Sequence, residues 1–174
     1  AEGDDIEAVA SRVPDSGGVF VVPAFAGMCA PHWDRAAQAS IVGLTLESSA
    51  EHVVRAGVEA MAFQTMDNLD ALIASGVAVP ELKVDGGAAR SNLLCQFQAD
   101  ISGIPIVRPT ELERTALGIA QVAGLGAGLW TRDDLASHWA VDRVFEPSMP
   151  DARREELTAG WHSAVEHTLA RTRG

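Results

Sequence analysis

The sequence is poor in cysteine, and its two cysteines, Cys29 and Cys95, lie far apart in the chain. Neither belongs to a Cys-x-x-Cys pair, which excludes the zinc sites and dithiol redox motifs built on such pairs. Long apolar runs are also missing, since no run approaches the ~18 residues that a membrane span requires. The acidic N-terminus lacks the basic-then-apolar pattern of a signal peptide. We therefore expect a cytoplasmic chain with no membrane partner.

Positive charge is scarce as well. Lysine and arginine number 13 against 24 aspartates and glutamates, so the formal net charge is −11. Nucleic-acid binders depend on contacts between basic side chains and phosphates, so no nucleic-acid partner is expected. A small anionic ligand such as a nucleotide remains compatible with this charge, because a few backbone N–H groups can hold it locally.

Enough apolar material is present for a core, at 47% of the 174 residues, which suits one domain. Turn signals and residue periodicity predict alternating strands and helices. We expect strands within 17–25, 81–84, 105–109 and 143–147, and helices near 4–13, 48–76, 91–102, 113–130, 131–139 and 151–170. This alternation is typical of an α/β fold with parallel strands. So few strands among so many helices indicate an incomplete sheet.

The helix at 48–76 has the strongest pattern. Ser48 and Glu51 have the spacing of a capping box, and Gly76 is a stop signal. One apolar face follows the helical period of 3.6 residues; its members are Val54, Val58, Met61, Ala62, Thr65, Leu69, Leu72 and Ile73. The small-residue helix at 113–130 is expected to pack closely against a sheet or another helix.

The stretch "VDGGAARSN" at 84–92 joins a strand to a helix. Gly86 and Gly87 lack a Cβ, so a ring or phosphate can approach their backbone closely. Ser91 is a predicted cap of the next helix, whose N-terminal amides favour an anion. Neither common glycine-rich phosphate motif is present. These residues alone are equally compatible with a nucleotide contact and with a simple turn that needs glycine.

Several motifs in one order carry a family resemblance. They are "GVFVVPAFAGMCAPHWD", "IVGLT", "VEAMAFQTMDNLDAL", "VDGGAARSNLLCQFQADISGIPIVRP", "TALGIAQVAGLGAGLW" and "FEPSMPDARREELTAGWHSAV". Together they resemble the C-terminal part of glycerol kinases within the FGGY carbohydrate kinase family, from Gly18 to about Leu169. A family signature also spans Ala39 to Glu59, from which Gly57 departs. The segment "DRAAQAS" departs from the family pattern too.

The resemblance implies the actin-like, sugar-kinase ATPase fold (ribonuclease H-like), with residues 1–174 as a partial, nucleotide-side C-terminal domain that lacks its first antiparallel strands. It implies that Gly87 and the position of Ser91 contact the nucleotide, with Gly86 shaping the loop. Relatives often carry asparagine at the Ser91 position, and Asn92 is expected to substitute for it. We therefore expect Gly86, Gly87, Ser91 and Asn92 to bind ATP or ADP.

The resemblance also implies what this portion does not supply. The catalytic aspartate, the residues that bind the polyol and the hairpins that contact the β- and γ-phosphates precede this region in the family, and the Mg²⁺ site is not expected in this chain. The expected function is thus the nucleotide-binding part of a polyol kinase, most simply glycerol kinase, with catalytic and metal residues elsewhere. The competing hypothesis is an inactive remnant that binds nucleotide weakly or serves as an assembly module. The missing strands would leave a bare sheet edge, so we expect a homo-oligomer or pairing with an N-terminal segment.

Overall fold

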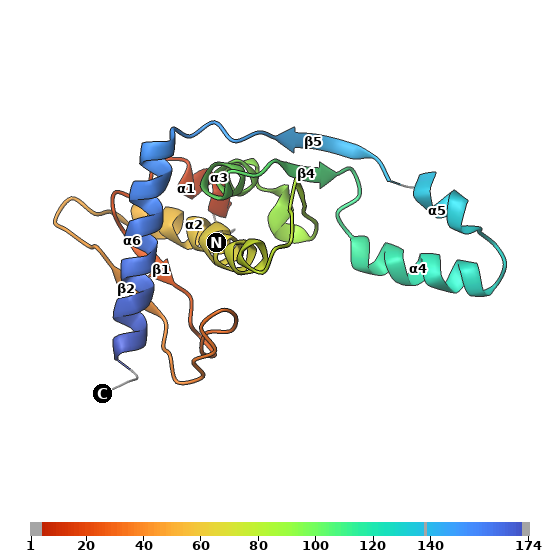
Figure 1. The fold of residues 1–174 in the computed structure, drawn as a ribbon. Coiled ribbons are helices and arrows are strands. Elements are labelled where there is room, and N and C mark those ends of the chain that lie inside the picture. The colour runs from red at the N-terminus through yellow and green to blue at the C-terminus, as the bar shows by residue number, and fades with distance from the viewer. Residues whose placement is uncertain (1–4, 138, 172–174) are drawn as a thin grey trace.

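The computed structural model describes residues 5–137 and 139–171, and Figure 1 shows their arrangement. In chain order the elements are α1 (Ile6–Ala10), β1 (Phe20–Val22), β2 (Ser40–Val42), α2 (Ala50–Ala74), β3 (Leu82–Lys83), the 3₁₀ helix η1 (Gly87–Arg90), α3 (Asn92–Ser102), β4 (Ile106–Pro109), α4 (Arg114–Gly126), α5 (Arg132–Ser137), β5 (Val141–Phe145) and α6 (Asp151–Ala170). None of the described helices is apolar over a length that would cross a bilayer.

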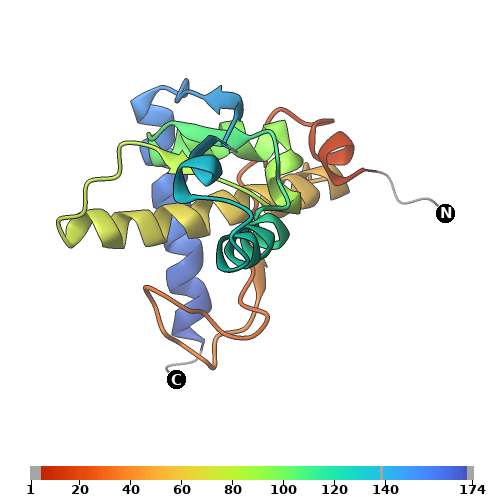
Figure 2. The same ribbon diagram turned by 90° about the vertical axis from the view of Figure 1, so that its right-hand side faces the viewer.

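The main core lies where α2, α3, α6 and β1 meet. Figure 2 shows α2 and α6 crossing, with α3 beside them. Phe63 of α2 is at the centre, with its ring stacked on Trp161 of α6 at a centroid distance of 5.1 Å. Phe97 of α3 meets the same ring edge-on at 5.4 Å, and Phe20 of β1 lies at 5.8 Å. Aromatic groups from four elements therefore fix the relative positions of these helices.

A sheet of strand order β3-β4-β5 lies against α3. The strands β3 and β4 are parallel, as expected, because α3 connects them as a crossover helix. The strand β5 is antiparallel to β4, and β1 pairs with β2 as a separate antiparallel ribbon. The expectation of parallel strands is thus correct only for β3 and β4. Among the described residues, no strand pairs with the outer edge of β3.

The long helix α2 forms where the sequence predicts it, but its cap and its buried face differ in detail. The cap is Ser49, whose backbone N–H donates to Nδ1 of His52 at 3.1 Å. Ser48 instead accepts a hydrogen bond from the amide of Thr45, so the prediction of a Ser48–Glu51 box is wrong. Val58, Ala62 and Leu69 are buried as expected, while Met61, Leu72 and Ile73 are exposed.

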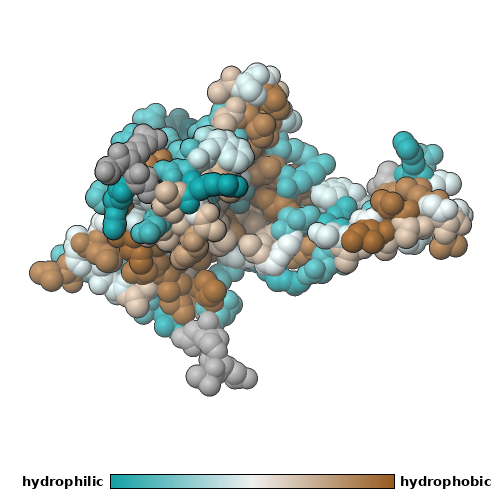
Figure 3. Space-filling view, turned by 90° about the horizontal axis from the view of Figure 1, so that it is seen from below, coloured by the Kyte–Doolittle hydropathy of each residue, from teal (hydrophilic) through white to brown (hydrophobic). Residues whose placement is uncertain are grey.

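The helices α4 and α5 form a lobe that projects from the body, as Figures 1 and 3 show. Of the described residues of α4, only Gly124 is buried, and the atoms nearest to it belong to Trp130. Ile119 and Val122 are 69% and 70% exposed. The expectation that this small-residue helix packs closely against a sheet or helix is therefore wrong for the described chain.

Candidate functional site

The loop after β3 continues the sheet before it turns. The amide of Val84 donates to the carbonyl of Val107 at 3.1 Å, and that of Gly86 donates to the carbonyl of Leu112 at 3.0 Å. Gly86 has φ +80° and ψ 179°, a combination that only glycine adopts readily. The backbone turn alone thus explains glycine at position 86.

Gly87 has no comparable internal reason to be glycine. Its φ lies outside the left-handed region, and a Cβ built on it meets no atom within 4 Å. The residue is exposed and begins η1, where its backbone faces open space. Since neither conformation nor packing demands glycine here, the missing side chain leaves room for an external group to approach the backbone closely.

A cavity of about 510 Å³ lies in front of this loop. One wall consists of loop residues, namely Gly87, Ala88, Arg90 and Ser91. The opposite wall is largely apolar and comes from α1, α2 and α3, through Ile6, Val58, Met61 and Leu94, with the carboxylates Asp5 and Glu7 beside them. The volume and mixed lining are in the range of small-molecule sites.

The N-terminus of α3 is already occupied by protein groups. The Ser91 hydroxyl accepts from the amide of Leu94 at 3.0 Å, which confirms Ser91 as the cap. A carboxylate oxygen of Glu7 accepts from the amide of Leu93 at 3.1 Å. A phosphate at this helix end would have to displace Glu7, whose negative charge already complements the helix dipole. The cavity is therefore better suited to the neutral end of a nucleotide than to its phosphates.

The structure brings part of the predicted set together. Gly87 and Ser91 line the cavity, whereas Gly86 and Asn92 do not. Sequence reasoning missed the opposite wall, where Met61 is predicted on the core face of its helix but is 42% exposed. The helical period of 3.6 residues does not indicate that Met61 lines a cavity, because it places Met61 on the same face as Val58 and Ala62.

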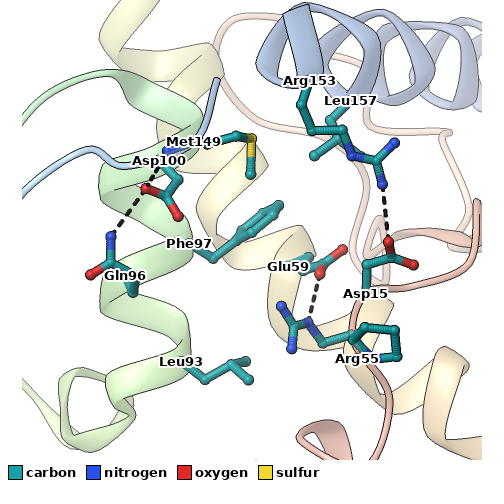
Figure 4. A pocket seen from close by; sticks show the side chains of 11 residues that line it. Asp15, Arg55, Glu59, Leu93, Gln96, Phe97, Asp100, Met149, Arg153 and Leu157 are labelled. Atoms are coloured by element: carbon teal, nitrogen blue, oxygen red, sulfur yellow. Dashed lines mark hydrogen bonds and ion pairs between the residues drawn. The ribbon is translucent and has the colours of Figure 1, made fainter. Parts of the chain in front are cut away.

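A second cavity of about 400 Å³ separates α2, α3 and the start of α6 (Figure 4). Arg55 donates from Nε to Oε1 of Glu59 at 2.6 Å, and Arg153 donates to Asp15 at 3.2 Å. On the α3 side, one carboxylate oxygen of Asp100 accepts from the amide of Ser148 at 2.7 Å. Arg55 and Glu59 both belong to α2, whereas the Arg153–Asp15 and Asp100–Ser148 contacts join separate parts of the chain, so this lining contributes to tertiary structure. Residues 5–137 and 139–171 contain no cluster of three His, Cys, Asp or Glu side chains that would hold a metal ion.

Comparisons with known proteins give the context for this geometry. A sequence profile for the C-terminal domain of the FGGY family of carbohydrate kinases matches residues 4–127. The glycerol kinases of Stenotrophomonas maltophilia and Carboxydothermus hydrogenoformans are each 52% identical to the chain, over 168 and 163 residues, or 95% and 92% of it. These alignments cover 34% and 33% of the two relatives, so the chain spans about a third of their length.

Solved structures agree with these relatives. The glycerol kinase of Plasmodium falciparum with ADP superposes with a TM-score of 0.82 at 35% identity, covering 96% of this chain and 34% of that one. The xylulose kinase of Rhodospirillum rubrum superposes with a TM-score of 0.76 at 26% identity, again covering 96% and 34%. The fold is thus the α/β fold of the sugar-kinase C-terminal domain, present in part.

Proposed function

The chain belongs to the FGGY family of carbohydrate kinases, and we propose that it is the nucleotide-binding C-terminal portion of a glycerol kinase. The observation that carries this proposal is the open backbone of Gly87, which faces a cavity with a largely apolar opposite wall at the carboxyl end of β3. Ligands of open α/β sheets bind outside the carboxyl ends of the strands. The structure of the Plasmodium falciparum relative contains ADP, which supports the choice of ligand.

Within this site, the residues have separate roles. Gly86 sets the turn, Gly87 lets the adenine or ribose approach the backbone, and Ser91 combines capping of α3 with contact to the nucleotide. Asn92 is the first residue of α3 and is exposed; its proposed contact would reach the ligand from the rim. The apolar wall around Met61 covers the other face of the ring.

In the complete protein, we propose that a glycerol hydroxyl oxygen attacks the γ-phosphorus of ATP and loses its proton to a base. The bond from that phosphorus to the β,γ-bridging oxygen breaks, which yields glycerol 3-phosphate and ADP. Phosphoryl transfer relies on positioned donors, a metal such as Mg²⁺ and an oriented nucleophile. These groups are assigned to the part of the kinase that lies outside this chain. Residues 1–174 would form one nucleotide-side domain. The family profile ends at 127, but α6 lies beyond that limit and packs on α2 through Trp161 and Phe63.

A substitution at Gly87 tests the nucleotide site directly. Gly87→Val places a branched side chain where no protein atom lies within 4 Å, so unfolding is expected to be unchanged while ADP binding is lost. The matched control is Gly118→Val on α4, where an added Cβ also meets no atom within 4 Å. Calorimetric titration with ADP measures the difference. Equal ADP affinity in wild type and Gly87→Val would contradict the proposed site.

The kinase activity is tested by completing the protein. The chain is co-expressed with the first two thirds of the Stenotrophomonas maltophilia glycerol kinase, and ATP-dependent formation of glycerol 3-phosphate is measured. Activity that requires both parts, and falls with Gly87→Val, supports the proposal. If the parts associate without phosphorylating any polyol, the chain is an inactive nucleotide-binding or assembly module instead.

A further inference from the structure

Arg108 of β4 contacts the glycine loop from the sheet and is not among the residues that line the cavity. Its side chain is 12% exposed. The Nη1 group donates to the carbonyl of Ala89 at 3.0 Å and to that of Arg90 at 3.3 Å. Both carbonyls belong to η1, whose other residues Gly87 and Ala88, like Arg90 itself, line the cavity. Because the guanidinium is a rigid, planar set of donors, these bonds fix the loop relative to the sheet.

The orientation of Arg108 is set from β5. Arg108 pairs with Arg143 and Pro109 with Val141, so Asp142 is an extra residue in β5. Such a bulge re-aims side chains and is common beside functional sites. Here Oδ2 of Asp142 accepts from Nε of Arg108 at 2.7 Å. The ring of Phe145 lies 5.1 Å from the guanidinium carbon, which restricts the group further.

Other contacts do not replace this link. The thiol of Cys95 also donates to the carbonyl of Ala89, at 3.4 Å, but a thiol is a weak donor. The bond from the Gly86 amide to Leu112 holds only the first residue of the loop. Among the described contacts, Arg108 is the charged group that ties the second half of the loop to the sheet.

We propose that Arg108 is a positioning residue for nucleotide binding, and that Asp142 orients it. The strand β5 would then take part in nucleotide recognition without touching the ligand. The link to the nucleotide rests on the proposed function of the loop, while the effect on loop order rests on the contacts of Arg108 alone.

The test compares Arg108→Lys with Arg143→Lys in the full chain. Lysine keeps the charge of Arg108 but cannot bond both carbonyls and Asp142 in one fixed geometry. Arg143 is the cross-strand partner of Arg108, and its guanidinium carbon lies 4.5 Å from the same Phe145 ring, so Arg143→Lys is a matched control. Hydrogen exchange of the amides in 86–91, the midpoint of thermal unfolding and the Kd for ADP are measured for each variant.

We expect Arg108→Lys to speed exchange in the loop about tenfold and to raise the Kd for ADP by a similar factor, as expected for lost hydrogen bonds to a charged group. Arg143→Lys should change neither quantity. Asp142→Asn, which removes the charge that holds Arg108, should loosen the same amides by about threefold and carries the test if Arg108→Lys fails to fold.

The outcomes separate the two proposals. The positioning role is overturned if the loop amides exchange at the same rate in Arg108→Lys and Arg143→Lys. If Arg108→Lys fails to fold, the role is overturned by equal exchange rates in Asp142→Asn and wild type. A selective loosening of the loop in a chain whose wild type binds no ADP limits the role of Arg108 to the order of the loop, and overturns both the proposed nucleotide site and the role of Arg108 in nucleotide binding. Loosening that is matched by a loss of ADP affinity at an unchanged unfolding midpoint supports both.

Discussion

Glu59 carries a carboxylate that is almost fully removed from water. The residue is 2% exposed, and its Oε1 accepts from Nε of Arg55 at 2.6 Å. Burial raises the pKa of Glu59 above 4.5, and the hydrogen bond and charge of Arg55 offset only part of that rise. The ionised form therefore costs stability at neutral pH, as is typical of a buried charge whose partner does not fully replace its hydration.

The sign of the pH dependence follows from this shift. Between 4.5 and the raised pKa of Glu59, the folded chain holds a proton that the unfolded chain has released, so lowering the pH through this window stabilises the fold. We expect the free energy of unfolding of wild type, relative to Glu59→Gln, to rise as the pH falls from neutral toward 4.5. Urea unfolding at several pH values measures the difference, with Glu166→Gln at an exposed position of α6 as control. A difference that falls toward acid pH would contradict the assignment.

The glycine pair shows which residues of the site the sequence makes predictable. Gly86 and Gly87 stand next to each other after a strand, and Ser91 follows at a helix start, so local rules locate the loop. Met61 and Ile6 complete the cavity from elements that lie far away in the chain. Their role depends on how α1 and α2 meet the loop, which tertiary packing decides and local periodicity does not.

At the scale of elements, α3 combines a cap, a crossover and one wall of the site. Its bounds follow closely from the sequence, because Ser91 caps it and Gly103 ends it with φ +67°. Ser91→Ala removes the acceptor for the Leu94 amide and should lower the free energy of unfolding by about 1 kcal/mol. Ser91→Asn keeps a capping oxygen and should stay close to wild type. Urea unfolding monitored by circular dichroism measures both, and equal stability of all three proteins would contradict the capping role.

Other elements are less predictable. The helix α4 contains alanine, leucine and glutamine, which favour a helix, but also three glycines that weaken it, so local propensity predicts its existence only in part. The packing of α4 does not follow from the sequence, because Ile119 and Val122 meet no core in the described chain. In the same way, β5 is expected as a strand, but its antiparallel pairing and its bulge at Asp142 depend on a partner strand more than thirty residues away.

At the scale of the whole molecule, several surfaces lack a partner within the described chain. They include the outer edges of β3 and β5 and the apolar face of α4 with Ile119 and Val122 (Figure 3). Exposed apolar faces and open sheet edges favour association. We predict that the chain self-associates as its concentration rises, which light scattering after size-exclusion chromatography measures.

The contribution of α4 to that association is tested with paired lysines. Ile119→Lys with Val122→Lys should reduce the average mass at high concentration, since charge on the apolar face opposes burial. Ala159→Lys with Ser163→Lys adds the same charge to exposed positions of α6 and should leave association unchanged. A wild-type chain that stays monomeric at every concentration would contradict the prediction.

The contact between Arg108 and Asp142 has a consequence for the order of events during synthesis. The two residues are 34 positions apart, and α4 and α5 are made between them. A chain that emerges N-terminus first completes its glycine loop well before the aspartate that orients Arg108 leaves the ribosome. Until β5 closes, the loop on the nascent chain lacks its final support. Arrest of translation within α4 or α5 would leave the chain without β5 and also without Trp161 of α6, which completes the main core.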